Sequence, residues 1–393
     1  MKIIIAPDSF KESLTAIEVS QAIEEGMKSV FPTAKYVKIP MADGGEGTVY
    51  SLVNATGGKV IPKVVTGPLG EPVESFFGIL GDGKTAVIEM AAASGLGQVP
   101  NEKRNPLLTT TYGVGELIIE ALNYGVEKII IGLGGSATND AGAGMLQALG
   151  VSFLTDEGTE IGFGGGELGK IRTIDMSGLD RRLASVSFEV ACDVDTPLVG
   201  SKGASAIFGP QKGATPDMVQ VLDGNLAHFA NCVQKTLGKD IRNLPGSGAA
   251  GGLGGGIIAF LPAELKSGVD IVIEATGLSD HMADADLVIT GEGKIDNQTI
   301  CGKTPIGVAK AAKKYNLPVI AIAGHLGSDS YVVKEHGIDA LLSIVPGVVS
   351  LENALENARE YVERCAENIG TSISVGMGLK LEGNYKVSRM VLK

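Results

Sequence analysis

Residues 128–149 read KIIIGLGGSATNDAGAGMLQAL, and the fold prediction starts from this stretch. Four residues rich in isoleucine, 128–131, predict a short buried strand. A glycine-rich loop, 132–140, follows the strand. The next segment, 141–149, is rich in alanine and glycine and predicts a closely packed helix. A strand, a loop and a helix in this order form one half of a βαβ unit, which is typical of a parallel sheet.

The same alternation recurs along the chain. Short runs rich in isoleucine and valine predict further strands at 2–6, 36–39, 86–89, 188–191, 286–290, 318–321 and 340–344. Stretches with helical periodicity predict helices at 16–30, 113–123, 216–237, 306–315 and 351–368. The chain is therefore expected to be an α/β protein, in which ligands gather beyond the carboxyl ends of the strands.

The order of these elements predicts two domains. The first 60 residues or so supply too few elements to bury a core alone, and the β-α pattern returns cleanly after residue 284. We expect residues 1–62 and 283–379 to form one domain, with an α/β domain, 63–282, inserted between them. The charged tail, 380–393, is expected to be either disordered or a remnant of expression.

Composition narrows the functional classes. The net charge of −12 comes without an obvious basic face, which argues against nucleic acid as the main partner. The four cysteines are far apart and fit a reducing compartment, and the N-terminus does not read as a signal peptide, so we expect a cytoplasmic protein. The uncharged stretch 244–263 is too rich in glycine for a membrane span and predicts a loop before a short buried helix.

The loop 132–140 is the first candidate site. Backbone amides at Gly134 and Gly135, with the hydroxyls of Ser136 and Thr138, would bind phosphate at the start of the next helix. Asp140 is a candidate for holding a cation. The alternative is a tight turn in which Thr138 or Asn139 caps the helix.

A second candidate loop, TGEGKID at 290–296, follows the predicted strand 286–290. Glu292 and Asp296 are candidate Mg²⁺ ligands, and Lys294 is a candidate phosphate contact, because the flanking glycines would let the backbone approach a nucleotide. Lys303 lies just before the helix 306–315 and is a further phosphate candidate. The sequence around it lacks the spacing of a true P-loop.

Acids follow three other predicted strands. Asp193 and Asp195 come after 188–191 and would bind metal or act as a base, unless they only form a turn before Pro197. Asp8, with Ser9 and Lys11, follows the first strand, and Asp43 follows the second. Either of these two loops alone is more typical of a solvated turn. Lys212, in FGPQKGA, adds a cation.

Seven blocks together resemble the bacterial glycerate kinase type I family: PDSFKES (7–13), ADGGEGT (42–48), GLGGSATNDAGAG (132–144), CDVDTPL (192–198), FGPQKGA (208–214), GSGAAGGLGGG (246–256) and ITGEGKID (289–296). The resemblance covers about residues 1–379. It implies transfer of the ATP γ-phosphate to a hydroxyl of D-glycerate. It also implies a flavodoxin-like domain built from both chain ends.

With glycerate as substrate, the candidates acquire expected roles. Asp193 is the expected base, with Asp8, Asp43 and Asp296 as alternatives. Lys11 or Lys212 is expected to pair with the substrate carboxylate, beside Ser9. A homo-oligomer is compatible with the sequence, but no residue pattern indicates one.

Two other functions use the same residues. A non-catalytic binding protein for organic anions or nucleotides would need the glycines and lysines but not so many acids. A phosphatase would use Asp193 and Asp195 and release phosphate without ATP. Turnover of ATP with D-glycerate and Mg²⁺ separates the three.

Overall fold

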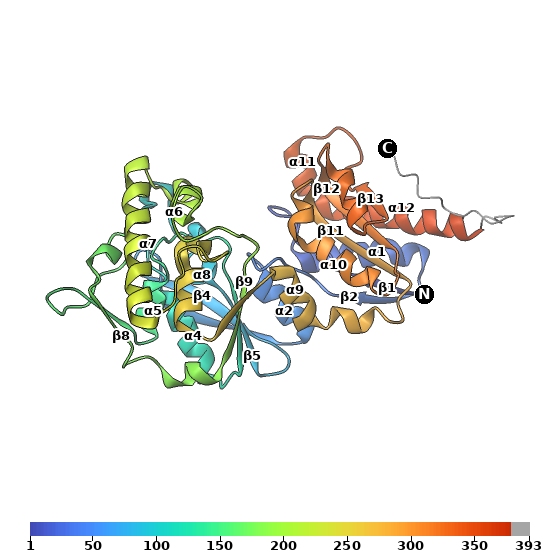
Figure 1. Cartoon of the computed structure of the whole chain (residues 1–393). Helices are drawn as coiled ribbons and strands as arrows, with labels where there is room; N and C mark the ends of the chain where they lie inside the picture. Colours follow the sequence, from blue (N-terminus) through green and yellow to red (C-terminus); the bar gives the residue numbers. More distant parts are fainter. Residues whose placement is uncertain (379–393) are drawn as a thin grey trace.

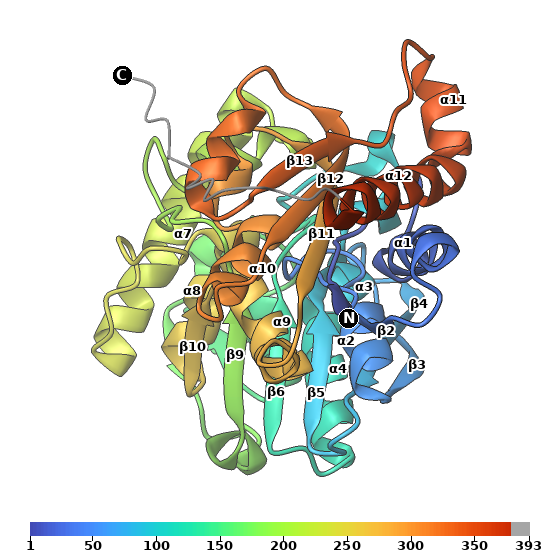
Figure 2. The same cartoon turned by 90° about the vertical axis from the view of Figure 1, so that its right-hand side faces the viewer.

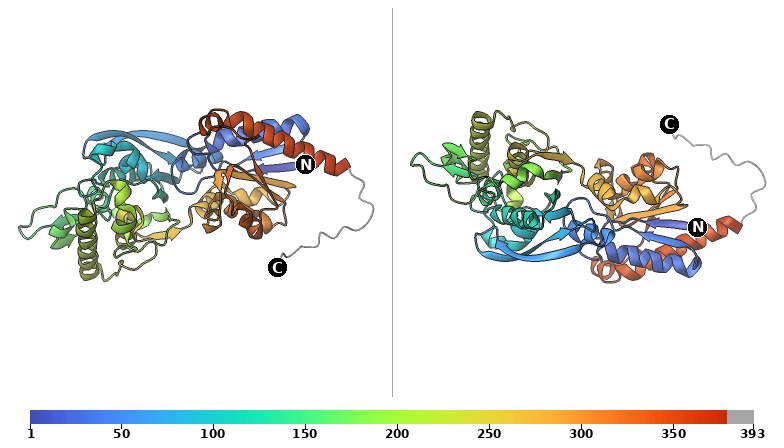
Figure 3. Two further views of the ribbon diagram at one scale, coloured as in Figure 1. Left: turned by 90° about the horizontal axis from the view of Figure 1, so that it is seen from above. Right: turned by 90° about the horizontal axis from the view of Figure 1, so that it is seen from below.

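The computed structural model describes residues 1–378, and the tail expected at 380–393 lies outside the described residues. The chain forms two lobes, one built from both ends of the chain and the other from its middle (Figure 1). Seen from above and below, the first and last helices lie side by side in the same lobe (Figure 3). The α/β prediction is confirmed.

The first lobe is a parallel five-stranded sheet. Its order is β13 (Ala340–Ser343), β12 (Val319–Leu326), β11 (Leu287–Ile295), β1 (Lys2–Ile5) and β2 (Lys35–Lys38). Numbered in chain order, this is the 2-1-3-4-5 arrangement of flavodoxin-like sheets, read from the other edge. Helices α1 (Ala16–Val30) and α12 (Ala358–Gly378) pack against each other, and α10 (Thr304–Lys313) follows β11.

The second lobe is a six-stranded mixed sheet. Its order is β10 (Ala263–Lys266), β9 (Ser187–Ala191), β6 (Lys128–Gly132), β5 (Thr85–Glu89), β4 (Pro72–Ile79) and β3 (Lys59–Thr66). The strands β10, β9, β6 and β5 are parallel, and β4 pairs antiparallel with β5 and with β3. The strands of this sheet lie side by side in Figure 2. A two-stranded sheet pairs β7 (Ser152–Leu154) with β8 (Thr173–Asp175).

The remaining helices mostly cover the second sheet. They are α3 (Met90–Ser94), α4 (Tyr112–Asn123), α5 (Ala143–Ala148), α6 (Ala204–Phe208), α7 (Pro216–Leu237) and α8 (Leu253–Phe260), with α11 (Leu351–Glu356) in the first lobe. The helix α8 is the short buried helix expected within the uncharged stretch 244–263. Among residues 1–378, no helix is both long and apolar enough to cross a membrane.

Two helices join the lobes. These are α2 (Thr48–Thr56) and α9 (Gly268–Thr276), which contact each other and share one hydrophobic cluster with strands of both sheets. The cluster includes Val49 and Val272 from the helices, Val288 from β11 and Ile130 from β6. One apolar core therefore runs across the junction.

Several predicted boundaries need correction. The expected domain boundary at residue 62 falls inside β3, which belongs wholly to the second sheet. The division into two domains stays a prediction, with its first boundary better placed before Lys59. The helix expected at 351–368 is divided into α11 and α12.

The predicted loop 290–296 is mostly strand. β11 continues to Ile295 and pairs with β12, with Lys294 opposite His325. A Cβ on Gly291 would lie 2.5 Å from the carbonyl oxygen of Ile322. This glycine is therefore required for close packing of two strands rather than for access of a nucleotide.

Candidate active site

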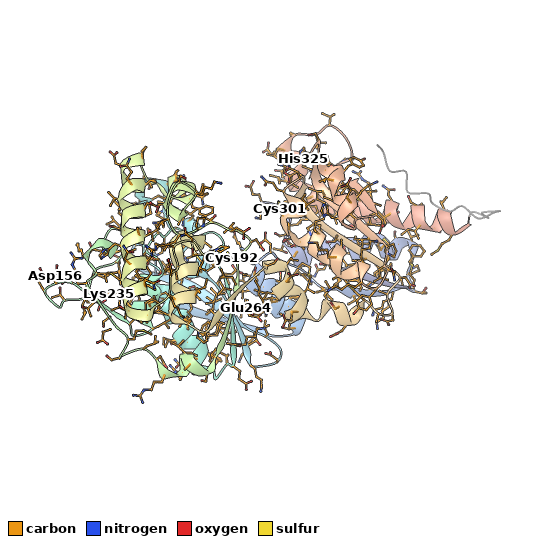
Figure 4. All side chains as sticks on the ribbon, in the orientation of Figure 1. Asp156, Cys192, Lys235, Glu264, Cys301 and His325 are labelled. Atoms are coloured by element: carbon orange, nitrogen blue, oxygen red, sulfur yellow. The ribbon has the colours of Figure 1, made fainter. Side chains whose placement is uncertain are left out.

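A cavity of about 370 Å³ lies where the two lobes meet. Loops that follow β1 and β2 of the first sheet and β6 and β9 of the second form its walls. Cys192 is the neighbour of Asp193 in that wall. It lies on the side of the second lobe that faces the first lobe, and Cys301 and His325 lie on the side of the first lobe that faces the second (Figure 4). The lining residues are Lys11, Asp43, Gly44, Gly45, Glu46, Leu133, Gly134, Gly135, Ser136, Ala191, Cys192, Asp193, Val194, Phe208, Gln211, Lys212, Ala249 and Ala250.

The loop after β2 is packed tightly between strand ends of the second sheet. A Cβ on Gly44, which has a φ of +85°, would lie 2.4 Å from the Cβ of Ala191. A Cβ on Gly132 would lie 2.3 Å from the carbonyl oxygen of Gly44. A Cβ on Gly268 would lie 1.9 Å from the carbonyl oxygen of Asp43. Glycines on three segments therefore permit this contact, which fixes Asp43 at the junction.

Lys212 lies beneath the loop after β6. Its Nζ donates to Ser136 Oγ and to the carbonyl oxygen of Thr138, both at 2.7 Å, and the residue is 2% exposed. Burial lowers the pKa of Lys212 to about 7, although Asp140 opposes the shift. A buried ammonium group without a carboxylate hydrogen-bond partner, at the wall of a cavity, favours binding of an anion there.

Asp140 has a structural role, which corrects its assignment as a cation candidate. Its carboxylate accepts from the Thr111 amide and hydroxyl, both at 2.8 Å, and from the amides of Gly142 and Gly144. The last two belong to the start of α5, which begins at Ala143 rather than at 141. Asp140 therefore occupies the helix N-terminus that was expected to bind phosphate.

Four carboxylates gather at the junction. Asp43 and Asp193 line the cavity, and Asp8 and Glu292 belong to the first lobe. Burial and repulsion from Asp43 raise the pKa of Asp8 to about 6, and burial raises the pKa of Glu292 to about 7, with contributions from Asp8 and Asp43. Partial burial also raises the pKa of Asp193, with Asp43 again contributing. Asp43 is thus electrostatically coupled to all three of the others.

Most of these acids also accept hydrogen bonds that fix their orientation. Asp8 accepts from the Ser9 amide and, at 2.6 Å, from the Thr304 hydroxyl at the start of α10. Asp193 accepts from the amide of Gly268, the first residue of α9, at 3.0 Å. Asp43 accepts from the Gly45 amide at 3.1 Å.

The other predicted residues lie away from the cavity wall. Glu292 accepts from Thr299 at 2.6 Å, with the Lys303 Nζ at 3.8 Å. Asp296 pairs with Lys294 at 2.8 Å. Thr138 is fully buried, so its side chain is not exposed to a ligand in the cavity. Ser9 also falls outside the lining residues.

Some lining residues were not predicted as site residues. Phe208 and Gln211 precede Lys212, and Ala249 and Ala250 belong to the glycine-rich segment before α8. Ala250 adopts a φ of +51°, which is rare for a residue with a side chain. Both segments lie in blocks that carry the family resemblance, and that resemblance was the only sequence signal for them.

Gly135 gives a direct test of the loop. Its φ of +76° is unfavourable for valine, and a Cβ would lie 3.1 Å from the Cβ of Ala91. We expect Gly135→Val to raise the KM of the anionic substrate bound there at least tenfold, or to abolish activity. Steady-state kinetics measure the effect, and circular dichroism confirms that the variant is folded. Unchanged kinetics in the folded variant would exclude a ligand contact at this loop.

The fold and the cavity together define a two-lobed α/β protein whose cavity has a lining suited to a small anion. The buried Lys212 and the acids Asp43 and Asp193 line this one cavity. Comparison with known proteins identifies the family within this class.

A profile described as the glycerate kinase family matches residues 3–374. The chain is 64% identical to a glycerate kinase of Bacillus subtilis, over 95% of this chain and 98% of that protein. It is 57% identical to a glycerate 2-kinase of Escherichia coli, over 96% and 99%. A crystal structure of a Salmonella typhimurium protein, described as a candidate glycerate kinase 2, is 54% identical, with a TM-score of 0.89 over 96% of this chain and all of that one. The chain belongs to the glycerate kinase family.

Proposed function

We propose that the protein transfers the γ-phosphoryl group of ATP to a hydroxyl group of D-glycerate in the cytoplasm. The observation that carries the proposal is the presence of Lys212 and the acids Asp43 and Asp193 in one cavity. A hydroxy acid needs a cation for its carboxylate and a base for its hydroxyl, and the cavity provides both.

The substrate is proposed to bind on the second lobe. Lys212 pairs with the glycerate carboxylate, while the amides of Gly134 and Gly135 contact its oxygens or the transferred phosphate. Lys11, which is exposed at the opposite wall, neutralises charge on the phosphate during transfer. The nucleotide is proposed to lie toward the first lobe, within reach of Lys294 and Lys303.

Asp43 is the proposed general base. It accepts the proton of the glycerate hydroxyl as that oxygen bonds to the γ-phosphorus and the bond to ADP breaks. Asp193 was the expected base, and each acid accepts one backbone hydrogen bond, Asp193 from the first amide of α9 and Asp43 from the Gly45 amide. Asp43 is favoured because it contributes to the raised pKa values of Asp8 and Glu292 in the first lobe and of Asp193 in the second, so in this proposal it is near both substrates.

Magnesium fits the first-lobe acids. Within residues 1–378 no three side chains form a ready-made metal site. Mg²⁺ needs only one or two carboxylates when substrate phosphates and water complete its shell. Burial, with repulsion from Asp43, raises the pKa values of both Asp8 and Glu292, and a cation bound beside them would stabilise their charged forms. When bound there, Mg²⁺ would neutralise the ATP phosphates.

The two predicted metal ligands should differ in effect. We expect Glu292→Gln to raise the Mg²⁺ concentration for half-maximal rate by about tenfold, because it removes a buried charge. Asp296→Asn should change it less than twofold, because Asp296 already pairs with Lys294. Titration of the rate with Mg²⁺ at saturating ATP measures both. A larger shift for Asp296→Asn would place the metal at the outer end of β11.

A coupled ADP-release assay tests the activity itself. Purified protein with ATP, Mg²⁺ and D-glycerate should release ADP and form phosphoglycerate, while omission of D-glycerate should abolish release. Binding of D-glycerate or ATP without turnover would instead support a non-catalytic binding protein. Phosphate release without ATP would support a phosphatase.

A further inference from the structure

Glu89 is a buried carboxylate to which neither the sequence nor the proposed reaction assigns a role. It is the last residue of β5 and is 4% exposed. Its Oε1 accepts from the backbone amide of Val49 at 2.7 Å, in the first turn of α2. Burial raises the pKa of Glu89, and hydrogen bonds from the amides of Val49, Gly47 and Thr48 oppose that shift.

The helix α2 has no capping side chain of its own. Its N-cap is Gly47, in the left-handed conformation with a φ of +90°. The first amides of a helix need acceptors, and a carboxylate near them also interacts favourably with the helix dipole. Glu89 supplies both from the end of β5 in the second sheet, 40 residues further along the chain.

Two hydrogen bonds connect this capped turn to Asp43. The Thr48 hydroxyl donates to the carbonyl oxygen of Gly45 at 2.7 Å. The Gly45 amide donates to Asp43 Oδ1 at 3.1 Å. The orientation of the Asp43 carboxylate is therefore linked to the position of the first turn of α2.

The same strand ends hold the loop in a second way. Glu89 is paired in register with Gly132 across β5 and β6. Gly132 is the glycine whose Cβ would lie 2.3 Å from the carbonyl oxygen of Gly44. Neighbouring residues on two strands thus contact the segment on both sides of Gly45.

We propose that Glu89 is a positioning residue: by capping α2 from the second sheet, it holds the Asp43 loop at the distance from the Gly134–Ser136 loop that the reaction requires. The inference rests on the proposed function, in which Asp43 is the base. Misplacement of a reacting group by about 1 Å lowers rates by about 10²-fold. Glu89 is buried and does not line the cavity, so its loss should act on kcat through Asp43.

The first test compares two substitutions at this site with a control. We expect Glu89→Ala to lower kcat by about 10–100-fold while the KM values for ATP and D-glycerate change less than threefold. Glu89→Gln keeps one acceptor oxygen for the Val49 amide, so it should recover part of the lost kcat. The control is Glu116→Ala: Glu116, in α4, also accepts a backbone hydrogen bond, from the Thr66 amide at 2.6 Å, but Thr66 ends β3 and is not part of the Asp43 loop.

Thermal unfolding separates positioning from simple loss of stability. Glu89→Ala and Glu116→Ala should lower Tm by similar amounts, and only Glu89→Ala should lower kcat when both are assayed well below Tm. If Glu89→Ala keeps kcat within twofold of the wild type, or if Glu116→Ala loses as much activity, the proposal is overturned.

A double-mutant cycle tests the route through Asp43. Asp43→Asn combined with Glu89→Ala should have the same kcat as Asp43→Asn alone, because the base is already absent. An additional loss equal to that of Glu89→Ala alone would show that Glu89 acts independently of Asp43. Failure of the proposed function is distinct, because the wild-type protein would then release no ADP with D-glycerate.

Discussion

Asp43→Asn should lower kcat by about 10²-fold or more, the usual scale for loss of a general base. Asparagine keeps the size of the side chain and an oxygen that can accept from the Gly45 amide, but it cannot accept the glycerate proton. The KM of ATP should change little. Single-turnover kinetics with saturating substrates measure the loss in the chemical step.

The matched control is Asp193→Asn, which changes the other acid of the cavity wall. Its loss of kcat should be smaller than that of Asp43→Asn by at least tenfold. The amide oxygen of asparagine can still accept from the Gly268 amide, so α9 should keep its position. If Asp193→Asn has the larger effect, the base is Asp193, as the sequence alone suggested.

Lys212→Met should raise the KM of D-glycerate by about 30-fold or more, since a hydrogen bond to a charged group contributes about 2 kcal/mol. Methionine fills a similar volume without a charge. The KM of ATP should stay within threefold if Lys212 binds the glycerate carboxylate. Equal losses for both substrates would instead assign Lys212 to the phosphate. Lys11→Met is the control, because Lys11 is the other lysine of the cavity wall.

The pH dependence of the same KM gives an independent check. In the free protein the pKa of Lys212 is lowered to about 7 by burial, from 10.5. Above pH 7 the free lysine is mostly neutral, so anion binding must take up a proton. The KM of D-glycerate should therefore rise with pH above 7, by up to about tenfold per pH unit, and this rise should be absent in Lys212→Met.

The lowered pKa of Lys212 also determines how the free energy of unfolding changes with pH. Between pH 7 and 10.5 the unfolded chain binds a proton at Lys212 that the folded chain does not. The contribution of this group to the free energy of unfolding therefore rises with pH across that window. Below pH 7 the charged, buried lysine destabilises the free protein by its full amount.

The sequence predicted helices best where their ends are marked locally. α7 has the predicted bounds, because Thr215 caps it, Pro216 begins it and Gly238 ends it in the left-handed conformation. α1 also has the predicted bounds, with a capping box formed by Thr15 and Glu18. In both cases every signal lies within a few residues of the helix.

The two helices that join the lobes were missed for the opposite reason. α2 begins after a glycine and is capped by Glu89, while the first amide of α9 is bonded by Asp193, 75 residues earlier in the chain. No local pattern predicts a cap from a residue that is 40 or 75 positions away in the chain. The hairpin β3–β4 was missed because β3 is an edge strand with exposed residues and Pro62, a composition that weakens the strand pattern.

The sequence identified the loops that form the candidate site better than it identified the roles of individual residues in them. Strand-end loops at Asp8, Asp43 and Asp193 and the cation at Lys212 were identified from sequence, and the structure brings them together. The sequence could not show that α5 begins only at Ala143 and that Asp140 accepts hydrogen bonds from the amides at its start. Nor could it show that β11 extends through Glu292 and Lys294. These outcomes depend on contacts with Thr111 and β12, which are far apart in the sequence.

The central position of β1 has a consequence for protein synthesis. β1 lies between β2 and β11, and the ribosome adds roughly 250 residues between β2 and β11, which takes about 12–50 s at typical elongation rates. During that time Ile3, Ile4 and Ile5, which are fully buried in the finished protein, have only one neighbouring strand. The second sheet can assemble first, and β1 gains its second neighbouring strand only when β11 emerges.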